Sequence, residues 1–283
     1  MTTKKNTRRL SRTFHKTFKP ERHYISALLR FSASGQDGDF QEIARATGIP
    51  MGTSSGKVPA IIEYSKGMGL VKATNNTKSN KKNSLELTDF GRIVLFEDPY
   101  LKYEITQWIA HFNLCNPIFG ADIWYYTFFL GSKLLGERHK RKDLENYLSM
   151  QYGIADKNLI GPLVGMYDDE ASFSLCGAIK ESRGTISKRE APILPEHTRG
   201  YGAWLIQLIA DNFPKQKQVL VSDLESIAGW ESITRWSKLN SQLALDLFER
   251  KGIIDVDRHM NPWIIQPRMS PDQAWKGIFD DIL

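Results

Sequence analysis

Two stretches of this chain repeat one pattern of apolar and polar positions. In each, an amphipathic helix ends at a glycine and passes into apolar residues, as EYSKGMGLV at 63–71 and FERKGII at 248–254. The glycine supplies the left-handed residue that closes a helix, and the apolar residues after it predict a strand that packs back on the core. Winged helix-turn-helix domains enter the wing from their recognition helix in this way, so DNA handling is the first hypothesis.

The first copy is predicted to span residues 21–88. Its expected elements are helices at 21–31, 40–47 and 57–66 and strands near 70–73 and 84–87. Asp39 is expected to cap the second helix, and the third is the expected recognition helix. Because the apolar residues of that helix face inward, Ser54, Ser55 and Lys57 are left available to a DNA groove or backbone.

Residues 89–155 are predicted to form a central helical domain rich in aromatic residues. Apolar residues at helical spacing predict helices at 89–96, capped by Thr88, and at 101–114, 122–135 and 142–152. We interpret the aromatic stripe, which includes Trp108 and Trp124, as a core. A base-stacking surface is the alternative interpretation.

Residues 156–283 are predicted to form an α+β domain, with short strands and turns over 159–193 and the second copy over about 222–265. The tip of this copy, Asp257-Arg258-His259, has no lysine, which favours a structural or protein-contact module over a second DNA reader. The fold class predicted for the whole chain is mainly α (α+β): an N-terminal winged helix-turn-helix, a central helical domain and a C-terminal winged-helix-like domain.

The composition is that of a folded protein rather than a membrane or secreted one. A chain of 283 residues with 41% hydrophobic content can bury a sizeable core in two or three domains. No apolar run approaches the roughly 18 residues of a membrane span, and no secretory signal precedes the basic start, so we expect a cytoplasmic protein. Cys115 and Cys176 lack metal-ligand spacing and are expected to be buried.

Positive charge is concentrated at the start of the chain. The formal net charge is +6, and seven Lys and Arg residues precede the first acid: Lys4, Lys5, Arg8, Arg9, Arg12, Lys16 and Lys19. Residues 1–20 are therefore expected to form a basic flexible arm on a nearly neutral body. A second cluster, Lys78, Lys81 and Lys82, lies at the predicted wing tip. Both clusters could contact phosphates without sequence specificity; a solubilising tail and a solvated loop are the alternatives.

Several motifs resemble a bacterial family encoded beside DNA phosphorothioation genes and typified by the SspB nicking protein. These motifs are HKTF at 15–18 with Arg22, LTDFGR at 87–92, DPYL at 98–101, Trp108 with His111 and Leu114, and IWYYTFF at 123–129. The resemblance covers about residues 14–150. The chain departs from the family at Tyr24-Ile25, where relatives usually carry a tryptophan, and in a looser glycine-rich turn before the expected recognition helix.

The resemblance implies a DNA-nicking or DNA-engaging protein of an antiviral defence system. Its implied partners are DNA, a cysteine desulfurase, an ATP-dependent sulfurtransferase of the phosphosulfate-reductase type, and an ATPase. Together such proteins replace a non-bridging phosphate oxygen with sulfur. The resemblance supplies no catalytic residues.

No short motif in the sequence identifies a nuclease site. Phosphodiester hydrolysis usually needs carboxylates that hold Mg²⁺ or Mn²⁺, or a His or Tyr near basic residues, and we expect no organic cofactor. One candidate site combines His111 and Glu104, two helical turns apart, with Asp98 in the Asp-Pro turn. The alternative is a core histidine with a satisfied hydrogen bond and a surface acid.

Two weaker candidates remain. The run Asp168-Asp169-Glu170 with Lys180 and Glu181 is interpreted as a solvated acidic turn, because neighbouring residues of a strand point to opposite faces. His15 beside Arg22 could hold a phosphate, and a capping role for Thr17 is equally compatible with the sequence.

The leading functional hypothesis is a phosphorothioation protein that binds DNA and nicks or opens one strand. A non-catalytic winged-helix adaptor that recruits the sulfur-transfer enzymes is the second hypothesis, and a transcriptional regulator is the third. Nicking by the protein would support the first, and binding without cleavage would support the second. A regulator would show tight preference for one operator.

Overall fold

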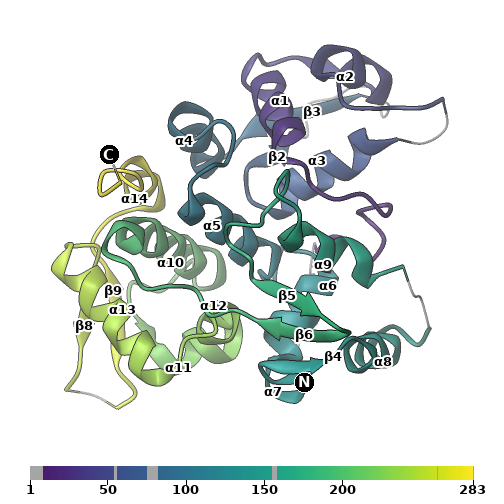
Figure 1. Cartoon of the computed structure of the whole chain (residues 1–283). Coiled ribbons are helices and arrows are strands. Elements are labelled where there is room, and N and C mark those ends of the chain that lie inside the picture. The colour runs from purple at the N-terminus through teal and green to yellow at the C-terminus, as the bar shows by residue number, and fades with distance from the viewer. Residues whose placement is uncertain (1–8, 54–55, 75–81, 155–157, 260, 283) are drawn as a thin grey trace. The chain divides into compact units, whose positions relative to one another are not determined.

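The computed structural model describes residues 9–53, 56–74, 82–154, 158–259 and 261–282 (Figure 1). Helices and small antiparallel sheets make up the structure, which confirms the α+β class. The chain forms two compact units, Met1–Arg189 and Glu190–Leu283, and each is described by itself. None of the helices in the described ranges has the length and apolar character needed to span a membrane.

The first unit begins with three helices and three short strands. They are α1 (Arg22–Ala33), β1 (Asp37–Gly38), α2 (Phe40–Thr47), α3 (Lys57–Gly67), β2 (Val71–Ala73) and β3 (Asn83–Leu87). The strands form an antiparallel sheet in the order β1-β3-β2. The cap expected for α2 is confirmed, because the Asp39 carboxylate accepts hydrogen bonds from the backbone N–H groups of Gln41 and Glu42 at 2.9 and 2.8 Å.

Helix α3 is buried on nearly all sides, which differs from the expectation of a recognition helix. Eight of its eleven residues are buried, and only Lys57, Glu63 and Lys66 are partly exposed. The helix packs against α1, α2 and α5 (Glu104–Leu114). The reason is its sequence, KVPAIIEYSKG, which places apolar residues around most of the circumference. A helix that reads a major groove needs an exposed polar face, and α3 does not present one.

Residues 9–20, expected to belong to a flexible arm, are packed on the body of the first unit. Leu10 forms a parallel bridge with Ala121, and its N–H donates to the carbonyl of Gly120 at 2.8 Å. The Phe14 ring lies edge-on to Tyr64, with ring centroids 4.8 Å apart. These two apolar side chains are buried and anchor the segment. The basic residues around them had led us to expect a solvated arm.

The start of helix α4 (Asp89–Glu97) is fixed tightly to the start of β2. The predicted cap is confirmed, because the Thr88 hydroxyl accepts from the N–H of Gly91 at 2.9 Å and also donates to the carbonyl of Gly69 at 2.5 Å. A Cβ atom at Gly91 would lie 1.9 Å from the carbonyl oxygen of Leu70, so only glycine allows this approach.

The central helices enclose an aromatic core, as predicted. After α4 and α5 come α6 (Asp122–Trp124), the π-helical η1 (Tyr125–Leu130), α7 (Ser132–Leu135), α8 (Arg141–Tyr152) and α9 (Ile160–Asp168). Trp108 and Trp124 are completely buried, as are both cysteines. Helix α9 occupies part of the region that was expected to contain only short strands and turns.

A second sheet closes the first unit. It contains β4 (Arg138–Lys140), β5 (Ile179–Ser182) and β6 (Thr185–Lys188) in the order β4-β6-β5, all antiparallel. Figure 1 shows β5 and β6 as a hairpin with β4 beside β6. The tip of the hairpin is tied to α8, because the N–H of Arg141 donates to the carbonyl of Gly184 at 2.9 Å.

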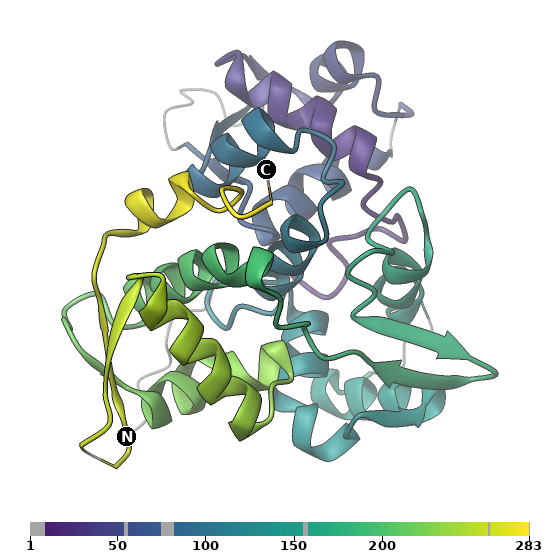
Figure 2. The same cartoon turned by 60° about the vertical axis from the view of Figure 1, so that its left-hand side comes forward.

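The second unit contains the order of the first repeat, a helix, a short strand, helices and a hairpin, with further short helices added. It contains η2 (Pro195–His197), α10 (Thr198–Asn212), β7 (Val219–Leu220), α11 (Val221–Asp223), η3 (Leu224–Ala228), α12 (Trp230–Thr234), α13 (Lys238–Arg250), β8 (Ile254–Asp257), β9 (Ile264–Pro267) and α14 (Pro271–Lys276). The sheet order β7-β9-β8 again pairs the first strand with the last. The β8–β9 hairpin forms the yellow-green strands at the lower left of Figure 2. Trp230, Trp236 and Phe248 are buried in its core.

Candidate functional site

His111 lies in the core of the first unit and makes a defined hydrogen bond. Its Nδ1 is 2.7 Å from the hydroxyl oxygen of Tyr167, which also accepts from Nε1 of Trp124 at 2.8 Å. The Tyr167 proton is therefore available to Nδ1. Burial lowers the pKa of His111 to about 3, so the ring stays neutral near pH 7. This arrangement matches the alternative of a core histidine with a satisfied hydrogen bond.

Asp98 and Glu104 also make local structural contacts. The Asp98 carboxylate accepts from the N–H groups of Lys102 at 2.7 Å and Tyr103 at 3.0 Å, which shapes the turn before α5. Burial raises the pKa of Asp98, although these hydrogen bonds oppose the shift. Glu104 accepts from Nε1 of Trp108 and pairs with Arg189 at 3.0 Å.

The structure does not bring the three predicted catalytic residues into one metal site. Within the described ranges, no group of three His, Cys, Asp or Glu side chains is placed to hold a metal ion. His111 makes its contact to Tyr167, whereas the two acids hold a turn and an ion pair.

Lys57 is held by the protein instead of facing solvent. Its Nζ lies 2.6 Å from a carboxylate oxygen of Glu21 and 4.9 Å from the centroid of the Tyr24 ring. Only 16% of its side chain is exposed, so a DNA phosphate would have to displace Glu21 to reach it.

The arginines near the start of the chain are likewise engaged. Arg9 pairs with Asp122 at 2.7 Å and lies over the Tyr125 ring, while Arg12 lies over the Tyr152 ring. Arg22 donates to the carbonyl of Glu170 at 2.6 Å. These contacts fasten residues 9–22 to the helical block.

His15 and Lys82 have different surroundings. His15 is buried, and its Nδ1 accepts a hydrogen bond from the N–H of Thr17 at 3.0 Å, so the histidine shapes this turn.

Lys82 is exposed at the edge of β3, and its Nζ lies 3.8 Å from a carboxylate oxygen of Glu42. Five other predicted DNA contacts lie outside the described residues: Arg8, Ser54, Ser55, Lys78 and Lys81.

A cavity lies between α9, the start of α8 and the β5–β6 hairpin. Its volume is about 380 Å³, and its charged lining consists of Arg141, Asp168, Glu181 and Arg183. Arg141 donates to Glu181 at 2.6 Å and also to Glu145 at 3.1 Å. Asp168 and Glu181 belong to the acidic run and strand that we interpreted from the sequence as a solvated turn, and the structure instead places both on the wall of this cavity.

The hairpin tip that borders this cavity carries an arginine in a left-handed conformation. Arg183 has φ 49° and Gly184 has φ 72°. A two-residue turn with two positive φ angles favours Asn-Gly or Asp-Gly, and a left-handed non-glycine residue costs about 1 kcal/mol or more. Arg183 forms no ion pair among the described residues. This conformation makes Arg183 a candidate for the proposals below, because it disfavours the residue for stability alone.

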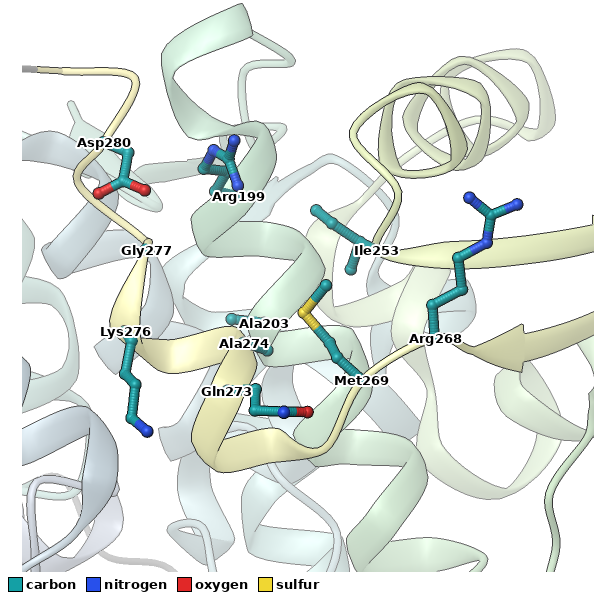
Figure 3. A pocket seen from close by; sticks show the side chains of 10 residues that line it. All are labelled: Arg199, Ala203, Ile253, Arg268, Met269, Gln273, Ala274, Lys276, Gly277 and Asp280. Atoms are coloured by element: carbon teal, nitrogen blue, oxygen red, sulfur yellow. The ribbon is translucent and has the colours of Figure 1, made fainter.

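The second unit contains a cavity of about 500 Å³ between α10, α14 and the strand ends (Figure 3). Three of its lining residues are cations, and each is paired: Arg199 with Asp281, Arg268 with Asp255, and Lys276 with Asp272. In Figure 3, Lys276 points away from the apolar centre formed by Ile253 and Met269. This cavity therefore offers little unpaired positive charge.

Comparison with known proteins identifies the family. Residues 13–159 match the family described as "Protein of unknown function (DUF4007)". The chain belongs to this DUF4007 family. No curated protein matches its sequence.

Two solved structures share the fold of this DUF4007 protein. One is a magnesium ion-bound SspB crystal structure with 15% identity, and the other an SspB crystal structure with 16% identity. In both cases the TM-score is 0.71, and the match covers 95% of this chain and 88% of the other. The resemblance predicted from the sequence is thus confirmed.

The cavity at α9 can be compared with the needs of a magnesium ion. Mg²⁺ is usually held by one or two carboxylates, with water and substrate phosphates completing its octahedral shell. Asp168 and Glu181 supply two carboxylates, of which Glu181 is already paired with Arg141. Two carboxylates are too few for an all-protein cage, so an ion here would need water and a bound phosphate as further ligands.

Proposed function

We propose that this DUF4007 protein is a DNA-binding component of a bacterial DNA phosphorothioation and antiviral defence system. One observation carries the proposal: the fold matches SspB over 95% of the chain. The motifs at 15–22, 87–101 and 123–129 support it independently, because they follow the same family in sequence. The implied partners are DNA and the desulfurase, sulfurtransferase and ATPase that install sulfur.

Both repeats support a winged-helix assignment. In each, a helix and a short strand precede two or more helices and a hairpin, and the short strand pairs with the last strand. Because α3 is buried, we assign DNA contact by the first repeat to its wing, where Lys72 on β2 and Lys82 just before β3 are exposed. Lys78 and Lys81, between these strands in sequence, complete the proposed contact.

The second repeat is proposed to bind protein. Its helix α13 exposes Leu239 and Leu243, 74% and 45% accessible, which lie on one helical face. Exposed leucines suit a protein partner better than a phosphate backbone. The first repeat is thus proposed to contact DNA and the second to contact protein, in agreement with the absence of lysine from the Asp257-Arg258-His259 tip of the second repeat.

Strand nicking is the second candidate activity, and the cavity at α9 favours it. Asp168 and Glu181 would hold Mg²⁺, which when bound neutralises charge on a phosphoryl group. Arg183 would bind a non-bridging phosphate oxygen, and Arg141 would hold the Glu181 carboxylate in position through their ion pair. His111, Glu104 and Asp98 have no part in this proposal, because each is committed to the structural contacts described above.

Two assays on the full chain test the proposals separately. Fluorescence anisotropy with a labelled duplex should show salt-dependent binding, and absence of binding would reject the main proposal.

The second assay tests nicking. Supercoiled plasmid incubated with the protein and Mg²⁺, Mn²⁺ or chelator should convert to open circle only with metal, and Asp168→Asn should abolish this conversion. The control is Glu170→Gln, which removes an exposed charge outside the cavity. Binding without any conversion would leave a non-catalytic adaptor.

A further inference from the structure

The sheet β4-β6-β5 has one buried face and one exposed face that differ sharply in chemistry. Successive residues of a strand point to opposite faces, and directly paired residues share a face. His139 and Ile186 are buried on the inner face, together with Ile179 and Lys188. Glu181, which is paired with Ile186, lies on the same inner face, and the other six residues of the three strands form the outer face.

The outer face consists of two rows of three residues across the strands. The first row is Arg138, Ser187 and Lys180, and the second is Lys140, Thr185 and Ser182. We refer to these six residues as the basic face. Its three cations and Ser182 are exposed, and Thr185 and Ser187 are partly exposed.

No acidic residue belongs to the basic face. The one acid on its strands, Glu181, points to the opposite side, where Arg141 holds it. None of Arg138, Lys140 and Lys180 forms an ion pair within the described part of the chain. The three cations therefore differ from Arg258, an equally basic side chain of the second unit whose charge is already paired with Glu249.

We propose that the basic face binds the phosphate backbone of duplex DNA. Within each row, paired residues have Cβ atoms about 5 Å apart, and the two rows are separated by about 7 Å. Cations and hydroxyl groups at these separations can donate to several phosphate oxygens at once, and such groups carry no base-specific information. The inference rests on the proposed DNA-binding function and adds a surface that neither winged repeat supplies.

The side chains of the basic face favour duplex over single-stranded DNA. Proteins that hold single strands combine cations with aromatic side chains on which exposed bases stack. The six residues include no aromatic ring. The pairing of β6 with β4 extends beyond the strands themselves, because the N–H of Lys188 donates to the Glu137 carbonyl at 2.9 Å. A fixed sheet face suits a regular backbone whose phosphates keep constant spacing.

The experiment measures anisotropy of a fluorescein-labelled duplex of arbitrary sequence, and of one of its strands alone, over a series of salt concentrations. The test variant is Arg138→Gln, Lys140→Gln, Lys180→Gln in the full chain. The matched control is Lys215→Gln, Lys217→Gln, Lys238→Gln, which removes three exposed cations from the second unit. Circular dichroism and thermal unfolding verify the fold of each.

We expect the test variant to weaken duplex binding by on the order of tenfold or more, and to reduce the slope of log K against log salt by about 0.9 for each lost phosphate contact. The control variant should keep the wild-type slope. If the triple variant does not fold, Lys180→Glu alone should weaken binding more than Lys217→Glu.

The remaining outcomes separate the two proposals. Wild-type binding that survives in the test variant as well as in the control would overturn the basic face and leave the DNA-binding function intact. A wild-type protein that binds no DNA would overturn the function itself and the basic face with it. Equal or tighter binding of the single strand, lost in the test variant, would overturn the duplex assignment.

Discussion

The Tyr167 hydroxyl lies 2.7 Å from Nδ1 of His111, inside a core of aromatic rings, and it is also the acceptor for the indole N–H of Trp124. Three helices meet at this oxygen, because His111 belongs to α5, Trp124 to α6 and Tyr167 to α9. The histidine that sequence reasoning placed at a nicking site therefore has a structural role that can be measured.

Burial of His111 predicts a pH-dependent stability. The pKa in the folded protein is about 3 and the ordinary value is 6.5, so below pH 6.5 the unfolded state binds a proton that the folded state does not. The free energy of unfolding should fall by up to about 1.4 kcal/mol for each pH unit between these values, and this contribution is absent above pH 6.5. Urea unfolding of wild type and His111→Gln across this range checks the prediction. The variant should lose that part of the slope, and equal slopes would contradict it.

Tyr167→Phe should destabilise the first unit without altering surface charge. Removing the hydroxyl leaves Nε1 of Trp124 and Nδ1 of His111 without their shared partner, at a cost of roughly 1–3 kcal/mol for each unsatisfied group. Tyr147→Phe is a suitable control, since its hydroxyl makes no hydrogen bond within the described residues. We expect a clear drop in the denaturation midpoint for Tyr167→Phe and little change for Tyr147→Phe. A similar midpoint for both would show that the hydroxyl contributes nothing.

Neutralising Lys78, Lys81 and Lys82 should weaken DNA binding for all sequences alike. Each lost phosphate contact should flatten the salt slope by about 0.9. Lys57→Gln is the contrasting variant: because Lys57 is paired with Glu21, its loss should cost about 1 kcal/mol of stability and leave the slope unchanged. The comparison needs only binding isotherms at several salt concentrations. A flat response to the wing variant would remove the wing from the interface.

Arg183→Asn should make the protein more stable and less active toward DNA. Asparagine tolerates the left-handed conformation at φ 49°, and Asn-Gly is the favoured two-residue hairpin turn. We expect a gain of about 0.5–1 kcal/mol in unfolding free energy. If Arg183 binds phosphate, duplex affinity or nicking should fall at the same time. A variant that gains stability and keeps full activity would show that the arginine is not used.

Local signals in the sequence predicted the parts of the fold that depend on neighbouring residues. Asp39 and Thr88 cap the helices that follow them, and the helical spacing of Trp108 and Trp124 marked the core correctly. A cap is made within three residues, and an aromatic stripe repeats along one helix, so both are visible without any knowledge of the tertiary structure.

The misjudged features depend on contacts between distant segments. The burial of α3 requires α5, and the packing of Leu10 requires Ala121. The cavity at α9 joins Asp168 with Glu181, and the basic face needs β4, which has three residues and is too short to display a strand period. Charge alone could not distinguish the paired Lys57 from the unpaired Lys180, because pairing is a property of the folded surface.

The burial of α3 also has a consequence for how relatives of this protein diverge. A winged-helix protein that reads bases through its third helix would need exposed side chains on that helix. Here eight residues of α3 are constrained by packing, so substitutions in this helix are selected for shape and volume. Under the proposed DNA-binding function, relatives with different targets should therefore keep α3 apolar and differ in the hairpins and the exposed sheet.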